Sequence, residues 1–238
     1  MTQINTDIDT HDKNLYFKRQ IELWGEDSQE LLSDKSILIV GCGGLGCSVA
    51  IGLGASGIGK IDLLDFDKVS IHNIHRQIGF TLEDEDINKA EALEKLLKSK
   101  SNYSQITSYD IDFDTFTQSN IITNLSGKYD LIIDATDNMK TRAMINKFAK
   151  SIDTPWLYGS VEEFNGYVCL FDEADFEDAF KITDKKPKGT ACPIVMQIAS
   201  LQSNMAIRYL LDLPVAKDKL YYCYYDGDGD YCVQKFKI

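Results

Sequence analysis

A glycine-rich stretch that follows the first apolar run of the chain is suited to binding phosphate groups. Residues 41–46 read Gly-Cys-Gly-Gly-Leu-Gly, which fits the nucleotide-loop pattern G-x-G-x-x-G and supplies Gly41, Gly43, Gly44 and Gly46. Glycine lets the backbone turn tightly and approach a phosphate, and the N-terminus of the following helix supplies N–H donors. The alternative is a tight turn that only packs a helix against a strand.

An acidic residue ends the next predicted strand, residues 60–65. Asp65 lies 19 residues beyond Gly46. At this place in a strand–helix–strand unit a carboxylate can accept hydrogen bonds from ribose hydroxyls. The loop and the acid together predict a nucleotide site, and they leave NAD and ATP as alternatives.

A polar segment with a cation follows the same strand, where ligands of open α/β sheets bind. Arg76 offers a planar fork to phosphate oxygens, and Asn73 and Gln77 can hydrogen-bond uncharged ligand atoms. Lys89, at the start of the next predicted helix, could reach the same pocket as a second cation. Taken singly, such residues are most often solvated side chains on a surface.

A second carboxylate follows the predicted strand 130–134, in Thr136-Asp137-Asn138. Asp137 would point into the same crevice, where it could hold Mg²⁺ bound to phosphates. The alternative is that one of these three residues caps the helix that follows. Two cations and a carboxylate around a glycine loop fit a triphosphate with Mg²⁺ better than a dinucleotide.

The elements that must position these residues alternate between strand and helix. Strands are expected at 36–40, 60–65, 105–111 and 130–134, and helices at 44–56, 87–100, 116–125 and 139–150. This order is typical of a Rossmann-like, doubly wound and mostly parallel sheet with helices on both faces. We expect a single domain over residues 13–238, beginning with a helix at 13–35, behind a flexible tail at 1–12.

The pattern changes after Pro155 to a C-terminal antiparallel extension. Strands are expected at 154–159 and 166–171 with no helix between them, followed by a hairpin at 220–226 and 230–237. A charged segment, 173–188, predicts a flexible loop, and 193–211 predicts a long apolar helix.

Composition excludes several classes of protein. The formal net charge is −12, which argues against binding nucleic acid through a general basic surface. No apolar run is long enough to span a bilayer, and the polar N-terminus does not resemble a secretory signal. The six cysteines form no C-x-x-C pair, so a cytoplasmic location with free thiols is expected.

The ordered set of these motifs resembles the ThiF/MoeB/HesA adenylyltransferases, bacterial relatives of ubiquitin-activating enzymes. The resemblance spans roughly residues 14–212 and includes Phe17-Lys-Arg19-Gln20 and Asn73-Ile-His-Arg76-Gln77. It implies that ATP adenylates the C-terminal glycine carboxylate of a small ubiquitin-like sulfur carrier ending in Gly-Gly. Pyrophosphate would be released, in thiamine (thiazole) or molybdopterin biosynthesis.

The resemblance also implies roles for individual residues. Gly44 matches the loop position at ATP, and Asp65 matches the ribose acid. The implied nucleotide-binding set also includes Gly41, Gly43, Gly46, Asn73, Gln77 and Asn138, and the implied catalytic set is Arg19, Arg76, Lys89 and Asp137, the last linked to Mg²⁺. Arg19 matches an arginine inserted into the partner subunit's site, which implies a homodimer.

The chain departs from this family in its cysteines. Many members bind a structural zinc through two C-x-x-C pairs, which are absent here, so no zinc site is predicted. Cys192, at the start of the predicted helix 193–211, is either a residue with a sulfur-transfer or thioester role or a small residue at a helix start. Two other functions stay open: an NAD-dependent oxidoreductase of Rossmann type and a non-catalytic, carrier-binding partner subunit.

Overall fold

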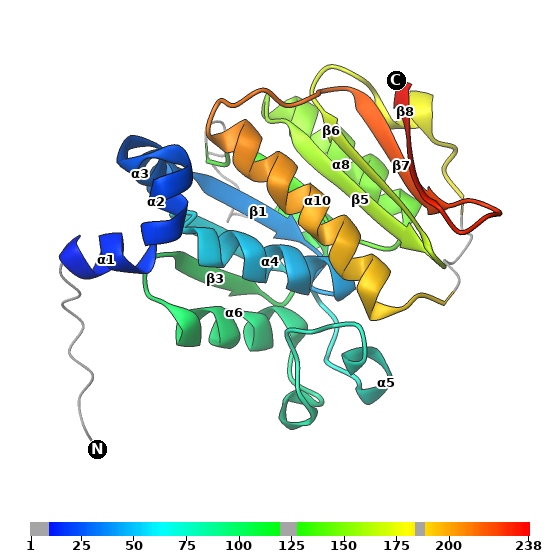
Figure 1. Ribbon diagram of the computed structural model, residues 1–238. Helices are drawn as coiled ribbons and strands as arrows, with labels where there is room; N and C mark the ends of the chain where they lie inside the picture. The colour runs from blue at the N-terminus through cyan, green and yellow to red at the C-terminus, as the bar shows by residue number, and fades with distance from the viewer. Residues whose placement is uncertain (1–9, 120–127, 184–188) are drawn as a thin grey trace.

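The computed structural model describes residues 10–119, 128–183 and 189–238, and its centre is one eight-stranded sheet (Figure 1). The strand order is β3-β2-β1-β4-β5-β6-β7-β8. Strands β3, β2, β1, β4 and β5 are parallel, and β6, β7 and β8 continue the sheet antiparallel. This confirms the predicted fold class, including the antiparallel C-terminal extension. The strand bounds are β1 (Ser36–Val40), β2 (Lys60–Leu64), β3 (Gln105–Tyr109), β4 (Leu131–Asp134), β5 (Trp156–Glu162), β6 (Asn165–Phe171), β7 (Lys219–Tyr225) and β8 (Tyr231–Lys237).

Helices cover both faces of the sheet. Figure 1 shows α4, α6 and α10 on one face and α8 on the other. No helix of the described residues is long and apolar enough to cross a membrane. The helices are α1 (Thr10–Tyr16), α2 (Lys18–Trp24), α3 (Glu26–Asp34), α4 (Gly44–Ser56), α5 (Ile71–Ile74), the 3-10 turn η1 (Leu82–Asp84), α6 (Lys89–Lys100), α7 (Phe113–Gln118), α8 (Met139–Ser151), α9 (Phe176–Ala179) and α10 (Cys192–Leu210).

The last four residues of β1, 37–40, are all apolar and all buried. Side chains alternate between the two faces of a strand. Ile37 and Ile39 therefore belong to the core under α4, α6 and α10, whereas Leu38 and Val40 belong to the core under α7 and α8. Because both faces are buried, β1 reads as a continuous apolar run rather than an alternating one.

The topology brings three chain segments to one edge of the sheet. Strands β2, β1 and β4 are adjacent and parallel, so their carboxyl ends lie at the same edge. After β1 the chain continues into α4 on one face, and after β4 into α8 on the other (Figure 1). Such a point of divergence is where open α/β sheets bind ligands.

The N-terminal region is more broken than the single helix predicted for residues 13–35. It forms three short helices, and Gly25, at φ +88°, separates α2 from α3. An L-residue adopts this backbone conformation only with strain, so glycine ends the helix here. Of the predicted tail 1–12, residues 1–9 lie outside the described residues, and α1 begins at Thr10.

The prediction of a flexible loop at 173–188 was wrong over 176–179; residues 184–188 lie outside the described part. Helix α9 forms there, and Phe176 is fully buried, with its ring centroid 5.6 Å from that of Trp156. Asp175 caps α9 and pairs with Lys150 at 2.8 Å. The sequence analysis weighed the charged residues of this segment and overlooked Phe176, whose buried ring anchors α9 to the core. The helix predicted at 116–125 begins earlier, as α7, and residues 120–127 are not described.

If α9 belongs to the core, Phe176→Ala should destabilise the protein by about 3–5 kcal/mol, the usual range for removing a buried phenylalanine. The matched control is Phe164→Ala, because Phe164 is 66% exposed at the turn between β5 and β6. We expect that variant to stay within about 0.5 kcal/mol of the parent. Urea unfolding followed by circular dichroism measures both, and equal stabilities would contradict the assignment.

Candidate active site

The glycine loop between β1 and α4 leaves no room for side chains at two positions. Gly41 has φ +93°, and its N–H donates to the Leu64 carbonyl at 2.8 Å. A Cβ on Gly41 would lie 2.8 Å from the Ala135 carbonyl oxygen, and one on Gly46 would lie 1.9 Å from the Gly41 oxygen. The loop is therefore pressed between β4 and the start of α4, as a phosphate-binding turn requires.

Two other segments approach this loop from outside. A Cβ on Gly44 would lie 2.9 Å from Val195 Cγ1 of α10 and 3.3 Å from the Arg76 carbonyl oxygen. A Cβ on Gly43 would meet only Gln77 Nε2, at an ordinary 3.5 Å. The first turn of α10 and the segment around α5 thus border the glycine loop.

The Asp65 carboxylate holds the loop to the end of β2. One oxygen accepts the Cys42 N–H at 2.7 Å, and the other accepts the Asp67 N–H at 2.8 Å. Burial raises the pKa of this carboxyl, while Lys89 and the two backbone donors act in the opposite direction. Each carboxylate oxygen has a second lone pair. Asp65 can therefore support the loop and accept a ribose hydroxyl at the same time.

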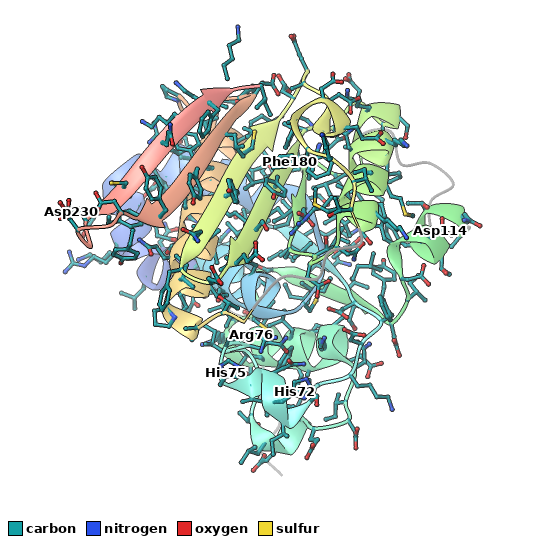
Figure 2. All side chains as sticks on the ribbon, turned by 90° about the vertical axis from the view of Figure 1, so that its right-hand side faces the viewer. His72, His75, Arg76, Asp114, Phe180 and Asp230 are labelled. Carbon is teal, nitrogen blue, oxygen red and sulfur yellow. The ribbon has the colours of Figure 1, made fainter. Side chains whose placement is uncertain are left out.

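The Arg76 guanidinium is held by two acceptors on its own segment. Nη2 donates to Asn73 Oδ1 at 3.1 Å, and Nη1 lies 3.1 Å from His75 Nε2. Figure 2 shows His72, His75 and Arg76 together around α5. An arginine has five N–H donors, so further donors remain for an anion. The buried Gln77 keeps its Oε1 without a hydrogen-bond partner among the described residues.

Lys89 is buried at the start of α6, and its Nζ lies 2.7 Å from Asp67 Oδ2. Asn88, which the sequence analysis did not single out, fixes this arrangement. Its Oδ1 caps α6, while its Nδ2 donates to the carbonyls of Asp65 and Asp67 and to Asp110 Oδ1 at 2.8–3.2 Å. A capping asparagine before a helix start was the only signal in the sequence.

The segment after β4 rests on a buried ion pair that the sequence analysis also missed. Arg142 of α8 donates from Nε to Asp134 Oδ2 at 3.1 Å and from Nη2 to the Thr136 carbonyl at 2.6 Å. Asn138 caps α8 by accepting the Thr141 N–H at 2.8 Å, the alternative role considered for this segment. Asp137 lies between these two anchors and is exposed.

Arg19 does not join this site within one chain. Helix α2 lies at the far end of α4, where a Cβ on Gly57 would meet the Phe17 ring at 2.7 Å (Figure 1). The 13 residues of α4 span roughly 20 Å at 1.5 Å per residue. The Arg19 side chain is 87% exposed and pairs with Glu22 at 2.8 Å.

The donor set fits ATP and Mg²⁺ in a specific way. At Gly43 the loop meets only the Gln77 amide nitrogen, and the Gln77 Oε1 has no hydrogen-bond partner among the described residues. Within the described ranges no group of three or more His, Cys, Asp or Glu side chains could hold a metal ion. A Mg²⁺ ion here would therefore take most of its ligands from phosphates and water, as is usual for this ion, with Asp137 as a protein ligand.

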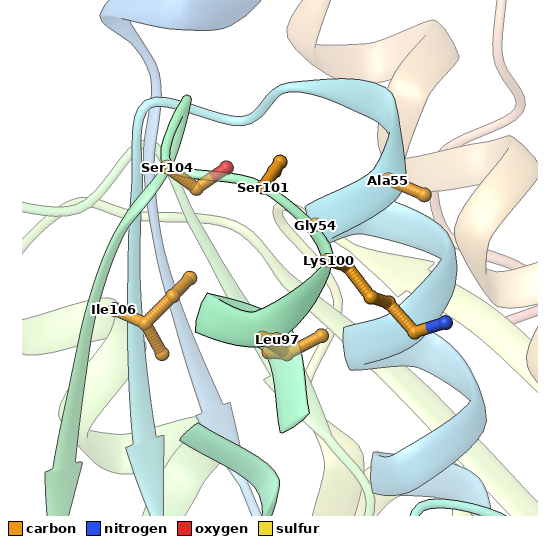
Figure 3. Close-up of a pocket in the computed structure, with 7 residues that line it drawn as sticks. All are labelled: Gly54, Ala55, Leu97, Lys100, Ser101, Ser104 and Ile106. Carbon is orange, nitrogen blue, oxygen red and sulfur yellow. The ribbon is translucent and has the colours of Figure 1, made fainter. Parts of the chain in front are cut away.

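One small cavity lies apart from the site, and the cysteines are all unpaired. A cavity of about 10 Å³ between α4, α6 and β3 has room for a single water molecule (Figure 3). All six cysteines are free thiols, and Cys192, the first residue of α10, is partly exposed.

The family of the chain follows from comparison with known proteins. Residues 17–237 match the ThiF family, and the chain therefore belongs to it. This confirms the resemblance drawn from the motifs.

Among curated relatives, the adenylyltransferase and sulfurtransferase MOCS3 of Dictyostelium discoideum is 35% identical over 199 residues, 78% of this chain and 45% of that protein. The molybdopterin-synthase adenylyltransferase of Escherichia coli K12 is 30% identical over 207 residues, 82% of each. The sulfur carrier protein adenylyltransferase of Thermus thermophilus is 34% identical over 147 residues, 62% of this chain and 53% of that protein. The chain spans about half the length of most of the curated relatives it matches.

Solved structures agree on the fold. The structure of PaaA has a TM-score of 0.79 at 20% identity, and the match covers 100% of this chain and 77% of the PaaA chain. The structure of E. coli MccB with ATP has a TM-score of 0.78 at 19% identity, and the match covers 97% of this chain and 73% of MccB. At these identities the likeness concerns the fold alone.

Asn88→Ala should weaken both the fold and nucleotide binding. Losing a cap costs about 1 kcal/mol, and leaving buried acceptors unpaired adds about 1–2 kcal/mol. Because Asn88 also fixes the segments that carry Asp65 and Lys89, ATP affinity measured by calorimetry should fall at least about tenfold, or about 1.4 kcal/mol.

The matched control is Asp112→Ala, which removes an exposed cap from α7. It should cost about 1 kcal/mol of stability and leave ATP affinity unchanged. If both variants bound ATP as the parent does, Asn88 would have only a capping role.

Proposed function

We propose that this protein uses ATP to adenylate the C-terminal glycine carboxylate of a small ubiquitin-like sulfur carrier ending in Gly-Gly. Pyrophosphate is released, and the product serves thiamine (thiazole) or molybdopterin biosynthesis. One observation carries the proposal: at one edge of the sheet the glycine loop is hydrogen-bonded to Asp65, the Arg76 backbone borders Gly44, and Asn88 ties Asp65 to the start of α6, where Lys89 is buried. The names of the curated relatives support the same chemistry.

The reaction needs positioning and charge neutralisation more than a proton acceptor. A carrier carboxylate oxygen attacks the α-phosphorus of ATP, a new phosphorus–oxygen bond forms, and the bond to the bridging oxygen of pyrophosphate breaks. The carboxylate is already ionised near neutral pH, so no general base is required. Catalysis then depends on holding the two reactants in line and stabilising the leaving charge.

Each residue of the site has a role in this scheme. The N–H groups at the start of α4 face the phosphates, and Asp65 accepts a ribose hydroxyl. Asn73, Arg76 and Lys89 contact phosphate oxygens, while Gln77 and Asn138 line the nucleotide pocket. Mg²⁺, held by Asp137, supplies positive charge on the phosphates when it is bound.

To contact a phosphate oxygen, the Lys89 ammonium group must leave the Asp67 carboxylate. The ammonium group is paired with Asp67, whose side chain is 54% exposed. Because more than half of the Asp67 side chain is exposed, its carboxylate can be solvated by water when the buried lysine changes partner. A polyphosphate, which offers more negative charge, can therefore take over the Lys89 ammonium group without disrupting the fold.

The remaining parts of the proposal concern assembly and location. The position of Arg19, at the far end of α4 from the glycine loop, favours an action on the site of a second subunit in a homodimer. The cytoplasm, with free thiols and no structural zinc, is the expected compartment. An NAD-dependent oxidoreductase or a non-catalytic partner is less well supported, because the curated relatives are named adenylyltransferases.

Asp137→Ala should abolish Mg²⁺-dependent exchange of pyrophosphate into ATP, because it removes the carboxylate proposed to hold the ion. The assay uses the purified sulfur carriers of the thiamine and molybdopterin pathways, each supplied separately. Asp153→Ala, at another exposed aspartate outside the site, is the control and should exchange normally. Exchange at the parent rate in Asp137→Ala would remove this residue from the mechanism.

Arg19→Ala and Asp137→Ala should each be inactive alone and active when mixed. After random subunit exchange about half of the dimers are heterodimers, each with one site that has both residues. About a quarter of the parent activity should therefore return. Mass spectrometry of the intact dimers checks that subunits exchange; if they exchange and no activity returns, Arg19 does not act on the partner's site.

A further inference from the structure

Strand β8 is the last strand of the sheet, and one of its two edges has no neighbouring strand among the described residues. Figure 1 shows the hairpin of β7 and β8 at the rim of the sheet, with α10 over the inner strands β5 and β6. Large side chains of β8 are exposed on both faces: Tyr231 and Val233 on one face, at 42% and 45%, and Phe236 on the other, at 41%. An uncovered edge strand is a template for pairing with a strand of another chain.

The backbone groups at the free edge of β8 belong to its odd-numbered residues. In an antiparallel pair, successive residues direct N–H and C=O alternately toward and away from the partner strand. At one end of the hairpin the Asp226 N–H donates to the Asp230 carbonyl at 3.0 Å. At the other end the Ile238 N–H donates to the Asp218 carbonyl at 3.2 Å. Because the register between these points is unbroken, even-numbered residues of β8 face β7. The residues that direct N–H and C=O away from β7 are Tyr231, Val233, Lys235 and Lys237.

Strand β8 lacks most of the protection that edge strands usually carry. Proline, a bulge or charged side chains commonly prevent such a strand from pairing. The sequence of β8 contains no proline, and it pairs with β7 residue for residue along its whole length, without a bulge. Its only charged side chains are Lys235 and Lys237. A partner strand therefore has to bring negative charge to this end of β8.

The hairpin itself carries that negative charge at its opposite end. The turn before β8 contains Asp226, Asp228 and Asp230, all exposed, and Figure 2 shows Asp230 at the outer tip of the hairpin. Lys235 and Lys237 lie at the other end of the strand and are also exposed. A parallel copy would place like charges together, whereas an antiparallel copy places the lysine end of each strand beside the aspartate turn of the other.

We propose that β8 pairs antiparallel with β8 of a second copy of the chain, across a two-fold axis at Gln234. The two eight-stranded sheets then continue as one sheet. The occupant of the edge is a second copy because the charges of the hairpin complement themselves in this orientation. Two chains of net charge −12 repel overall. Salt screens charges more than about 10 Å apart, so the nearby lysines and aspartates dominate at the contact.

The position of the axis follows from the outward backbone groups. With the axis at Gln234, Tyr231 lies opposite Lys237 of the partner subunit, and Val233 lies opposite Lys235 of the partner subunit. Every outward N–H and C=O of both strands then has an acceptor or donor. An axis one residue away leaves the outward groups at one end of each strand unpaired, and unpaired backbone groups at a contact cost free energy. The two Gln234 side chains face each other and can hydrogen-bond across the axis.

This contact goes beyond the proposed function and does not rest on it. Strands β4, β5, β6 and β7 separate β8 from β1 and its glycine loop. Pairing at β8 therefore leaves the nucleotide site open, and it is separate from the contact proposed for Arg19. A variant that loses the pairing should keep its affinity for ATP.

The first test removes one outward N–H from the free edge. Val233→Pro deletes a donor that points away from β7, so the hairpin loses no hydrogen bond of its own, and proline is tolerated at such positions of edge strands. Sedimentation velocity of the full chain should give Val233→Pro half the mass of the parent, whether or not the chain also assembles through Arg19. The matched control is Val233→Thr, which keeps the N–H and should sediment as the parent does. Circular dichroism and calorimetry with ATP check that both variants are folded.

The second test locates the two-fold axis. Opposite Cβ atoms of an antiparallel pair are about 4.5–5.5 Å apart, close to the separation found in disulfides. With the partly exposed Cys192 and Cys232 changed to serine, Gln234→Cys should form a disulfide between two copies under mild oxidation. The control is Asp228→Cys, an exposed position of the same hairpin. It lies far from its own copy in an antiparallel pair and should stay reduced.

The outcomes decide the pairing directly. Half the parent mass for Val233→Pro together with a disulfide at position 234 would support it. Equal masses for Val233→Pro and the parent, a monomeric parent, or a Gln234→Cys variant that stays reduced would overturn it.

Discussion

The Asp65 carboxylate joins the glycine loop after β1 to the end of β2, and the geometry of the site depends on it. Its two oxygens accept N–H groups of Cys42 and Asp67, so one side chain orders both the glycine loop and the segment after β2, which includes Asp67, the ion-pair partner of Lys89. Burial makes the charge expensive, as the raised pKa shows, and the two donors and the Lys89 ammonium group offset that cost.

Two further polar residues extend this support to the neighbouring strands. Asn88 ties Asp65 and Asp67 to the N-terminus of α6 and to Asp110 beyond β3. On the other side, Arg142 ties the end of β4 to the Gly159 carbonyl of β5 at 3.3 Å. Each of these two side chains is buried and donates hydrogen bonds to several acceptors at once. A replacement of similar size that lacks these donors would leave the acceptors unpaired.

Local signals predicted the parts of the fold that are determined locally. Ser36–Val40 and Gly44–Ser56 begin and end as expected, because an apolar run, a glycine turn and a small-residue helix are read directly from neighbours. The hydrogen bond between Asp65 and the glycine loop follows from the topology, which brings the ends of β1 and β2 together, whereas the roles of Arg76 and Lys89 stay predictions. Asn88, Arg142 and Phe176 were missed, since their roles depend on partners such as Asp110, Gly159 and Trp156, which only the folded chain places beside them.

The central place of β1 has a consequence for the order in which the chain folds. Ile37 of β1 pairs with Ile61 of β2, 24 residues away, and on the other side with Leu131 of β4, 94 residues away. Contacts so distant in sequence form slowly. During synthesis from the N-terminus, β1, α4 and β2 are available well before β4. The glycine loop packs against Ala135 only once β4 has formed, so a chain that ends before β4 lacks one side of the packing around this loop.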